Sequence, residues 1–303
     1  MSDKVKSLYN EIVDSFYFKR LHDISFLGII DYMNSNYSGD YQYRYTRADH
    51  TCGVFELSDI LSNKCLFSEE ETIIIAATAL CHDMGHGAFS HSLERAYLKI
   101  NPLISHRTIV KEIVSGENSD VGRILNDYGV DTNRLVGLCV GNKGDYLNWI
   151  FHDPINVDTI DGIYRFFLSF KLVPPFDRYR CVNTLFNLYS GSELSAEEIE
   201  ELDIFWESKG AFYGEFLSRG AFAQYEANFI ELASKSKADV GIDDFFMPEQ
   251  DVLESLDWDR VGSSGGRLRK CKLPASQFLI NKNVSLKSLS DLRLRYERIR
   301  WSD

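Results

Sequence analysis

The stretch that decides the fold is Cys81-His82-Asp83-Met84-Gly85-His86-Gly87-Ala88-Phe89-Ser90-His91-Ser92-Leu93-Glu94. It places three histidines, an aspartate and a glutamate directly after the apolar run 72–80. Histidine and carboxylate side chains are the usual ligands of divalent metals. Polar groups beside a buried run are costly unless they are paired or bound to something. The stretch therefore predicts the floor of a metal-dependent hydrolytic site.

The rest of the chain predicts an all-α protein, because apolar residues recur mostly at helical spacing and strand patterns are few. A capping box at Ser195-Ala196-Glu197-Glu198 predicts the start of another helix, with amphipathic patterns continuing through 234. Loops are expected over 34–46 and 262–266, where small and polar residues cluster. We expect the remaining helices over 5–33, 47–61, 69–80, 94–100, 106–114, 157–170 and 250–256.

The composition is that of a soluble globular protein of 303 residues, with 44% hydrophobic and 26% charged residues. No apolar run approaches the roughly 20 residues that cross a membrane. The N-terminus lacks the apolar segment of a secretory signal. The six cysteines are scattered without a CxxC pair, which favours a reducing compartment. We therefore expect a cytoplasmic protein that does not interact with membranes.

The net charge of −12 disfavours tight binding to a nucleic-acid backbone. An acidic protein can still bind a small anion where a metal and a few arginines reverse the local field. Arg20 and Arg47 are candidates for holding phosphate, because the guanidinium fork matches phosphate geometry. The composition therefore favours a small anionic substrate over a nucleic acid.

All seven histidines lie between positions 22 and 152, so the chemistry is expected in the N-terminal half. We expect a catalytic core over 1–175. A mostly helical region over 176–303 would complete the pocket or provide an assembly surface. His22 and His152 are expected to be structural, as most isolated histidines are.

Four residues are the metal-ligand candidates: His50, His82, Asp83 and Asp158. Neighbouring residues on a helix point about 100° apart. His82 and Asp83 can therefore share an ion only if other helices supply the remaining ligands. A second group is His86, His91, Glu94 and His106, in which His91 and Glu94 share a helix face. A histidine–carboxylate pair of this kind can orient general acid–base catalysis.

At these residues the sequence resembles the HD-domain phosphohydrolase superfamily. It is most similar to the deoxynucleoside triphosphate (dNTP) triphosphohydrolase branch, which includes the SAM- and HD-domain dNTPase and bacterial dGTPases. The resemblance extends over about residues 15–260, more loosely in the tract from Ala211 to Ser234. The motifs that carry it are Thr46-Arg47-x-x-His50, the segment from Leu80 to His91, Val157-Asp158, and Phe18-Lys19-Arg20-Leu21 with Leu27-Gly28.

The resemblance implies an HD-type helical bundle with a helical C-terminal extension, a nucleotide substrate and a homo-oligomer. It implies a divalent metal (Mn, Mg, Fe, Co, Ni or Zn) on His50, His82, Asp83 and Asp158. The reaction site would be lined by His86, His91, Glu94 and His106, with acid–base roles for Glu94 and His106. Substrate contacts are implied for Arg20, Leu27, Arg47, Asp161 and Arg165.

The sequence departs from that branch after the last metal aspartate. A lysine, a tyrosine and an aspartate of the branch are replaced by Thr159, Gly162 and Phe166, and an upstream glutamine by Phe26. From the resemblance, the first hypothesis is a dNTP triphosphohydrolase. The second is an HD phosphohydrolase of nucleoside monophosphates, cyclic dinucleotides or alarmones, and the third is a nucleotide-binding sensor without enzymatic activity.

Overall fold

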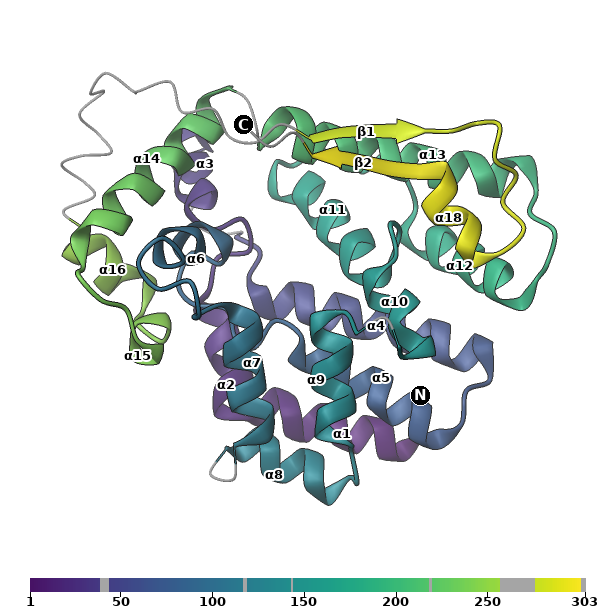
Figure 1. Cartoon of the computed structure of the whole chain (residues 1–303), viewed down its shortest axis with the longest axis horizontal. Coiled ribbons are helices and arrows are strands. Elements are labelled where there is room, and N and C mark those ends of the chain that lie inside the picture. The colour runs from purple at the N-terminus through teal and green to yellow at the C-terminus, as the bar shows by residue number, and fades with distance from the viewer. Residues whose placement is uncertain (39–43, 117–118, 143, 218–219, 257–275, 301–303) are drawn as a thin grey trace.

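The computed structural model describes residues 1–38, 44–116, 119–142, 144–217, 220–256 and 276–300. Regular structure in these residues is almost entirely helical, and one antiparallel pair of strands completes it (Figure 1). The predicted all-α class is confirmed. Within the described ranges, none of the helices combines the length and the apolar character needed to cross a membrane.

The first half of the chain supplies the helices that surround the histidine-rich stretch. They are α1 (Asp3–Asp14), α2 (Phe16–Lys19), η1 (Arg20–Asp23), α3 (Ile29–Ser38), α4 (Arg47–Cys65), α5 (Glu69–Cys81), α6 (His91–Tyr97), α7 (His106–Ser115), α8 (Asp120–Asp127), α9 (Thr132–Val140), η2 (Tyr146–Asn148), α10 (Trp149–His152) and α11 (Val157–Ser169).

The second half adds helices and the two strands. They are α12 (Arg178–Ser190), α13 (Ala196–Gly210), the π-helical segment η3 (Ala211–Phe216), α14 (Gly220–Ser236), α15 (Ile242–Phe245), α16 (Glu249–Ser255), β1 (Ser276–Ile280), α18 (Leu289–Arg295) and β2 (Tyr296–Arg300).

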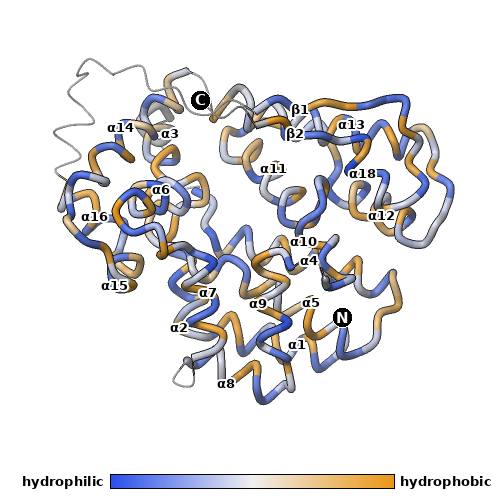
Figure 2. The backbone as a smooth tube through the Cα atoms, in the orientation of Figure 1, coloured by the Kyte–Doolittle hydropathy of each residue, from blue (hydrophilic) through white to orange (hydrophobic). Residues whose placement is uncertain are grey.

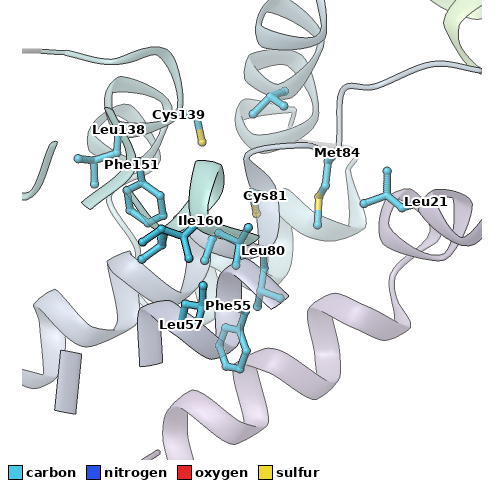
Figure 3. Close-up of a cluster of buried hydrophobic side chains, with 14 of the residues drawn as sticks. Leu21, Phe55, Leu57, Leu80, Cys81, Met84, Leu138, Cys139, Phe151 and Ile160 are labelled. Atoms are coloured by element: carbon cyan, nitrogen blue, oxygen red, sulfur yellow. The ribbon is translucent and has the colours of Figure 1, made fainter. Parts of the chain in front are cut away.

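The central pair of helices is α4 and α5, which pack against each other. Both begin with capping boxes, at Thr46 and Ser68, so their first turns are fixed. Residues 73–81 of α5 are all buried. Figure 3 shows core side chains from α4, α5, α9, α10 and α11 gathered in one cluster, among them Leu57, Leu80 and Ile160. The end of α5, where the histidine-rich stretch begins, is therefore rigidly held.

The C-terminal half surrounds this centre from two sides (Figure 1). On one side α14 packs against α3 and α6, with α15 and α16 beside it. On the other side α12, α13 and the strand pair pack together, and α12 also contacts α4. Hydrophobic and hydrophilic residues alternate along the outer helices (Figure 2), as expected of helices with one buried face.

The helix expected over 5–33 is divided into α1, α2, η1 and α3. The division occurs at Ser15, which has extended backbone angles and caps α2 with its side chain. The loop expected over 34–46 is wrong in its first part, because α3 continues to Ser38. Residues 39–43 and the loop expected over 262–266 lie outside the described residues.

Gly85 allows the turn after α5 to touch α7. A Cβ atom at Gly85 would lie 1.9 Å from the His106 carbonyl oxygen and 2.9 Å from the Val110 nitrogen, both of which are backbone atoms. We expect Gly85→Ala to lower the free energy of unfolding by about 3 kcal/mol. Gly137→Ala is the control, since its Cβ would meet only the Asn142 side chain, at 3.4 Å, and should shift stability by at most about 1 kcal/mol. Denaturant unfolding of both variants tests this, and equal stabilities would contradict it.

Candidate metal centre and the cavity around it

A cavity of about 240 Å³ lies where α4, α5, α6, α7, α9, α10, α11 and α14 approach one another. The C-terminal region contributes Phe212, Tyr213, Leu217 and Glu226 to its lining. The polar lining residues include His50, His82, Asp83, Asp158, His91, His106, Arg47, Arg95 and Arg107. Eight of the predicted site residues therefore line one cavity: His50, His82, Asp83, Asp158, His91, His106, Arg47 and Leu27.

His50 and His82 are both oriented by their Nδ1 atoms. His82 Nδ1 lies 2.8 Å from the carbonyl oxygen of Ala79, and His50 Nδ1 lies 2.8 Å from Asp161 Oδ2. Because a carbonyl or carboxylate oxygen accepts, each Nδ1 carries the hydrogen. Nε2 is therefore the nitrogen that each ring would offer to a metal, which is the arrangement that metal-binding histidines adopt.

Three of the four metal-ligand candidates, His50, His82 and Asp83, lie in one group, and the fourth, Asp158, contacts this group through His50. His50 Nε2 lies 3.1 Å from Asp158 Oδ1 and 3.7 Å from Asp83 Oδ2, and His82 Nε2 lies 3.6 Å from Asp83 Oδ1. Ligands roughly 2.1 Å from one ion stand roughly 3.0–3.4 Å apart in octahedral or tetrahedral geometry. The observed spacings are close to this, and His50, His82 and Asp83 form a group that can hold a metal ion.

His82 Nε2 provides the test of fit. This atom is buried and has no hydrogen-bond partner among the described residues. An unpaired buried nitrogen is costly, and here it lies 3.6 Å from Asp83 Oδ1. Burial lowers the pKa of His50, but its bonds to Asp158 and Asp161 outweigh this and raise the pKa to about 9. Without a metal, the His50 ring is therefore held protonated between carboxylates, and a divalent cation would displace the Nε2 proton. The imidazole and carboxylate donors fit such a cation.

Asp161 and Arg165 do not line the cavity, contrary to the substrate contacts that the resemblance implies. Asp161 is fully buried and accepts hydrogen bonds from His50 Nδ1, from Arg165 Nε at 2.6 Å and from Arg178 Nη1 at 3.0 Å. The pair therefore lies behind His50, where it orients the imidazole. Nothing in the local sequence indicates this, because 111 residues separate Asp161 from His50.

We expect Asp161→Asn to lower the affinity for the metal by about 10- to 100-fold, the usual effect of losing a carboxylate behind a histidine ligand. The substitution keeps the size of the side chain and removes the charge that fixes His50. A chelator-competition titration on folded protein measures the affinity. Asp145→Asn is the control, since Asp145 pairs with Arg134 and does not line the cavity. Equal affinities in the two variants would show that Asp161 does not orient the site.

The two candidate phosphate-binding arginines are placed differently. Arg47 lines the cavity and donates to Asp83 Oδ2 and Ser90 Oγ, both at 2.7 Å. Arg20 does not line it. Its Nη2 donates to the Met84 carbonyl at 2.7 Å, so Arg20 supports the turn after α5. The expectation that Arg20 contacts substrate is corrected accordingly.

Glu94 organises the second group of histidines. Its Oε1 accepts from the backbone nitrogen and Nδ1 of His106, at 2.8 and 2.6 Å, and its Oε2 accepts from His91 Nδ1 at 3.0 Å. These bonds outweigh the effect of burial and lower the pKa of Glu94. Nε2 is therefore the ring nitrogen of each histidine that Glu94 does not hold, and both rings line the cavity.

His86 occupies a different place from His91 and His106. It is buried, stacks on the His106 ring at a centroid distance of 4.3 Å, and its Nε2 lies 3.3 Å from Asp83 Oδ1. Burial lowers the pKa of His86 well below its ordinary value. His86 does not line the cavity, which corrects the expectation that it contacts the reacting phosphate. It lies instead between Asp83 of the metal-ligand group and His106.

Glu249 holds the turn that precedes His91, and sequence reasoning missed it. Phe89 and Ser90 have φ values of 57° and 50°, which are unfavourable for residues other than glycine. Glu249 Oε1 accepts from the backbone nitrogens of Phe89 and Ser25, at 2.9 and 2.8 Å. The C-terminal region therefore fixes the turn that positions Ser90 against Arg47.

Further lining residues were also missed. Arg95 follows His91 by four residues, a spacing that could have indicated it, whereas no sequence signal marks Glu226. His152 was expected to be structural. It donates from Nε2 to the Leu138 carbonyl and also lines the cavity.

The family model of the HD domain matches residues 47–128. The chain thus carries an HD domain, the helical domain of the HD phosphohydrolase superfamily, and the match supports a metal-dependent phosphohydrolase. It includes His50, His82 and Asp83, whereas Asp158 lies beyond it. The match does not distinguish the dNTP triphosphohydrolases from other HD-domain proteins.

Two curated relatives share about half of this chain. The "uncharacterized protein MG461" of Mycoplasma genitalium is 29% identical over 178 residues, 54% of this chain and 39% of that protein. The "uncharacterized protein YwfO" of Bacillus subtilis is 27% identical over 163 residues, 51% of this chain and 35% of that protein. The aligned part is therefore less than two fifths of each relative's length, and neither name states an activity.

A solved structure shares the fold. The crystal structure of a hypothetical protein from Aquifex aeolicus superposes with a TM-score of 0.68 at 20% sequence identity, over 86% of this chain and 71% of that one. At this identity the similarity shows the helical architecture alone.

Proposed function

We propose that this protein is a metal-dependent phosphohydrolase of nucleotides, and that its reaction is the hydrolysis of a dNTP to deoxynucleoside and triphosphate. The observation that carries the proposal is the buried Nε2 of His82, which has no hydrogen-bond partner among the described residues and lies beside His50 and Asp83. His50, His82, Asp83 and Asp158 would hold a divalent ion, which would supply Lewis-acid stabilisation of the phosphate charge.

The second histidine group supplies proton transfer. Water adds to the α-phosphorus, and the bond from that phosphorus to the 5′-oxygen of the deoxynucleoside breaks. The leaving oxygen needs a proton and the attacking water loses one. Because Glu94 holds Nδ1 of both His91 and His106, Nε2 of either ring is the atom that gives or takes the proton.

The apolar part of the cavity suits the nucleoside. Phe26, Leu27, Ile163, Phe212 and Leu217 line it, and flat apolar walls of this kind bind aromatic bases. Arg47 lies between this wall and the metal-ligand group, since it contacts both the Phe26 ring and Asp83. It is therefore proposed to contact the reacting phosphate.

One observation keeps a second candidate in view. Three of the four residues that depart from the dNTPase pattern, Phe26, Thr159 and Gly162, line the cavity in which substrate is proposed to bind. A phosphohydrolase of nucleoside monophosphates, cyclic dinucleotides or alarmones is the second candidate. The homo-oligomer and the cytoplasmic location remain predictions.

The test is a product analysis. Purified protein is incubated with each dNTP, and separately with the alternative substrates, in Mn²⁺, Mg²⁺ or Co²⁺, and the products are resolved by chromatography. The proposal expects deoxynucleoside and triphosphate. Release of orthophosphate from monophosphates alone would favour the second candidate. Recovery of unchanged nucleotide from a tight complex would instead favour a sensor.

A further inference from the structure

We propose that Arg107 binds a phosphate group beyond the one at the metal centre, so that the site selects nucleoside polyphosphates over monophosphates. The proposal rests on the proposed function and adds to it a substrate class and a binding residue. Arg107 was not among the residues that the sequence indicated.

The pairing of the lining arginines singles out Arg107. Arg47 is engaged by Asp83 and Ser90, and Arg95 donates to Glu226 at 3.0 Å. Arg107 also lines the cavity, but it forms no hydrogen bond or ion pair with any residue in the described ranges. Its guanidinium therefore keeps its full donor capacity for a ligand.

The charge of Arg107 reaches the interior of the cavity. Burial lowers the pKa of His152, and the positive charge of Arg107 lowers it further. Burial also raises the pKa of the Cys139 thiol to about 12, although Arg107 acts in the opposite direction. Both residues line the cavity. Asp158 and Asp83 act on the pKa of His152 and of Cys139, respectively, in the opposite direction to Arg107. Along this wall Arg107 therefore supplies the positive charge that offsets the metal-ligand carboxylates.

The position of Arg107 is fixed by its neighbour. Arg107 lies in the first turn of α7, directly after His106, whose backbone nitrogen and Nδ1 are both bonded to Glu94. The guanidinium is exposed, which places it at the mouth of the cavity. The wall next to it, formed by Leu138, Cys139, Phe151 and His152, contains no carboxylate that could compete with an anion.

The chemistry of the substrate completes the argument. A monophosphate has a single phosphate, which the metal centre and Arg47 would hold. A polyphosphate carries further phosphate groups, which would extend from the metal centre towards solvent. The guanidinium fork of an arginine binds such groups in a bidentate manner. In a protein with a net charge of −12, an unpaired cation at the mouth also attracts the anion locally.

The test compares the binding of three probes to Mn²⁺-loaded protein by isothermal titration: inorganic triphosphate, inorganic phosphate and a deoxynucleoside. For Arg107→Gln we expect triphosphate affinity to fall by about 10- to 100-fold, the loss of one charge-assisted contact. Affinity for phosphate and deoxynucleoside should change by less than about threefold. Arg107→Lys should recover part of the loss, because the charge returns without the fork.

Arg123→Gln is the matched control, since Arg123 is an exposed arginine on α8 that does not line the cavity. Equal weakening of phosphate and triphosphate by Arg107→Gln, or no weakening of either, would overturn the proposal. So would a wild-type protein that binds triphosphate no tighter than phosphate. The titration measures binding and needs no turnover, so it tests the role of Arg107 even if no nucleotide is hydrolysed. The proposal for Arg107 and the proposed hydrolase function can therefore be rejected independently.

Discussion

Replacing His82 by alanine is expected to remove the bound metal and the hydrolytic activity together. His82 contributes a buried Nε2 atom that has no other partner in the described part of the chain. Losing a carboxylate behind a ligand already lowers affinity by 10- to 100-fold, so losing a ligand should lower it by more than about 100-fold. Turnover at micromolar metal should fall at least as far, because the reaction depends on the ion.

Metal content after dialysis, measured by mass spectrometry, tests this prediction alongside nucleotide turnover. His22→Ala is the control, since His22 is exposed and absent from the cavity lining. A thermal unfolding curve for each variant separates loss of metal from loss of fold. A His82→Ala protein that is folded, inactive and still binds one equivalent of metal would show that His82 acts in another way.

Glu94→Gln is expected to give the opposite pattern, with metal retained and turnover lost. The glutamine amide has one oxygen and no negative charge, so it cannot hold Nδ1 of both His91 and His106 as the carboxylate does. Correct orientation and protonation of a general acid or base contributes about 100- to 10,000-fold. We expect the turnover number to fall within that range.

Single-turnover kinetics at saturating metal measure the chemical step for this variant. Glu112→Gln, an exposed substitution on α7, should behave as wild type. If Glu94→Gln loses metal in proportion to activity, the role assigned to the His91–Glu94–His106 group is wrong, and these residues would belong to the metal centre itself.

The features that could be predicted from sequence are those that local patterns encode. The buried run of α5 and the residues that follow it lie within one short stretch, so apolar periodicity and ligand chemistry indicated both the helix and His82 with Asp83. His50 and Asp158 are distant in sequence, and the resemblance to HD proteins joined them to the same site. The Ser195 capping box likewise predicted the start of α13, which the structure confirms.

What sequence could not provide is the direction in which a charged side chain points. Arg20 and Asp161 were recognised as polar residues near the motifs, yet each bonds to groups behind the cavity. The partners of Glu249 lie 160 and 224 residues away, and no local pattern records such pairings. The strands β1 and β2 were also missed, because each has five residues and α18 lies between them.

The division of the first helix has the same origin. Apolar spacing continues through 5–33, so periodicity alone predicts one element. The break depends on Ser15, whose side chain accepts from the Phe18 nitrogen and donates to the Ile12 carbonyl. Serine competes with helical hydrogen bonding in this way, but only the structure shows where it does so.

The central claim is that His50, His82, Asp83 and Asp158 bind one divalent cation. The most direct test is a crystal grown with Mn²⁺, with diffraction data collected at the manganese absorption edge. The account predicts one anomalous peak within roughly 2.0–2.3 Å of Nε2 of both histidines and of a carboxylate oxygen of each aspartate. No peak among these four residues at saturating metal, or a peak bound elsewhere, would contradict it.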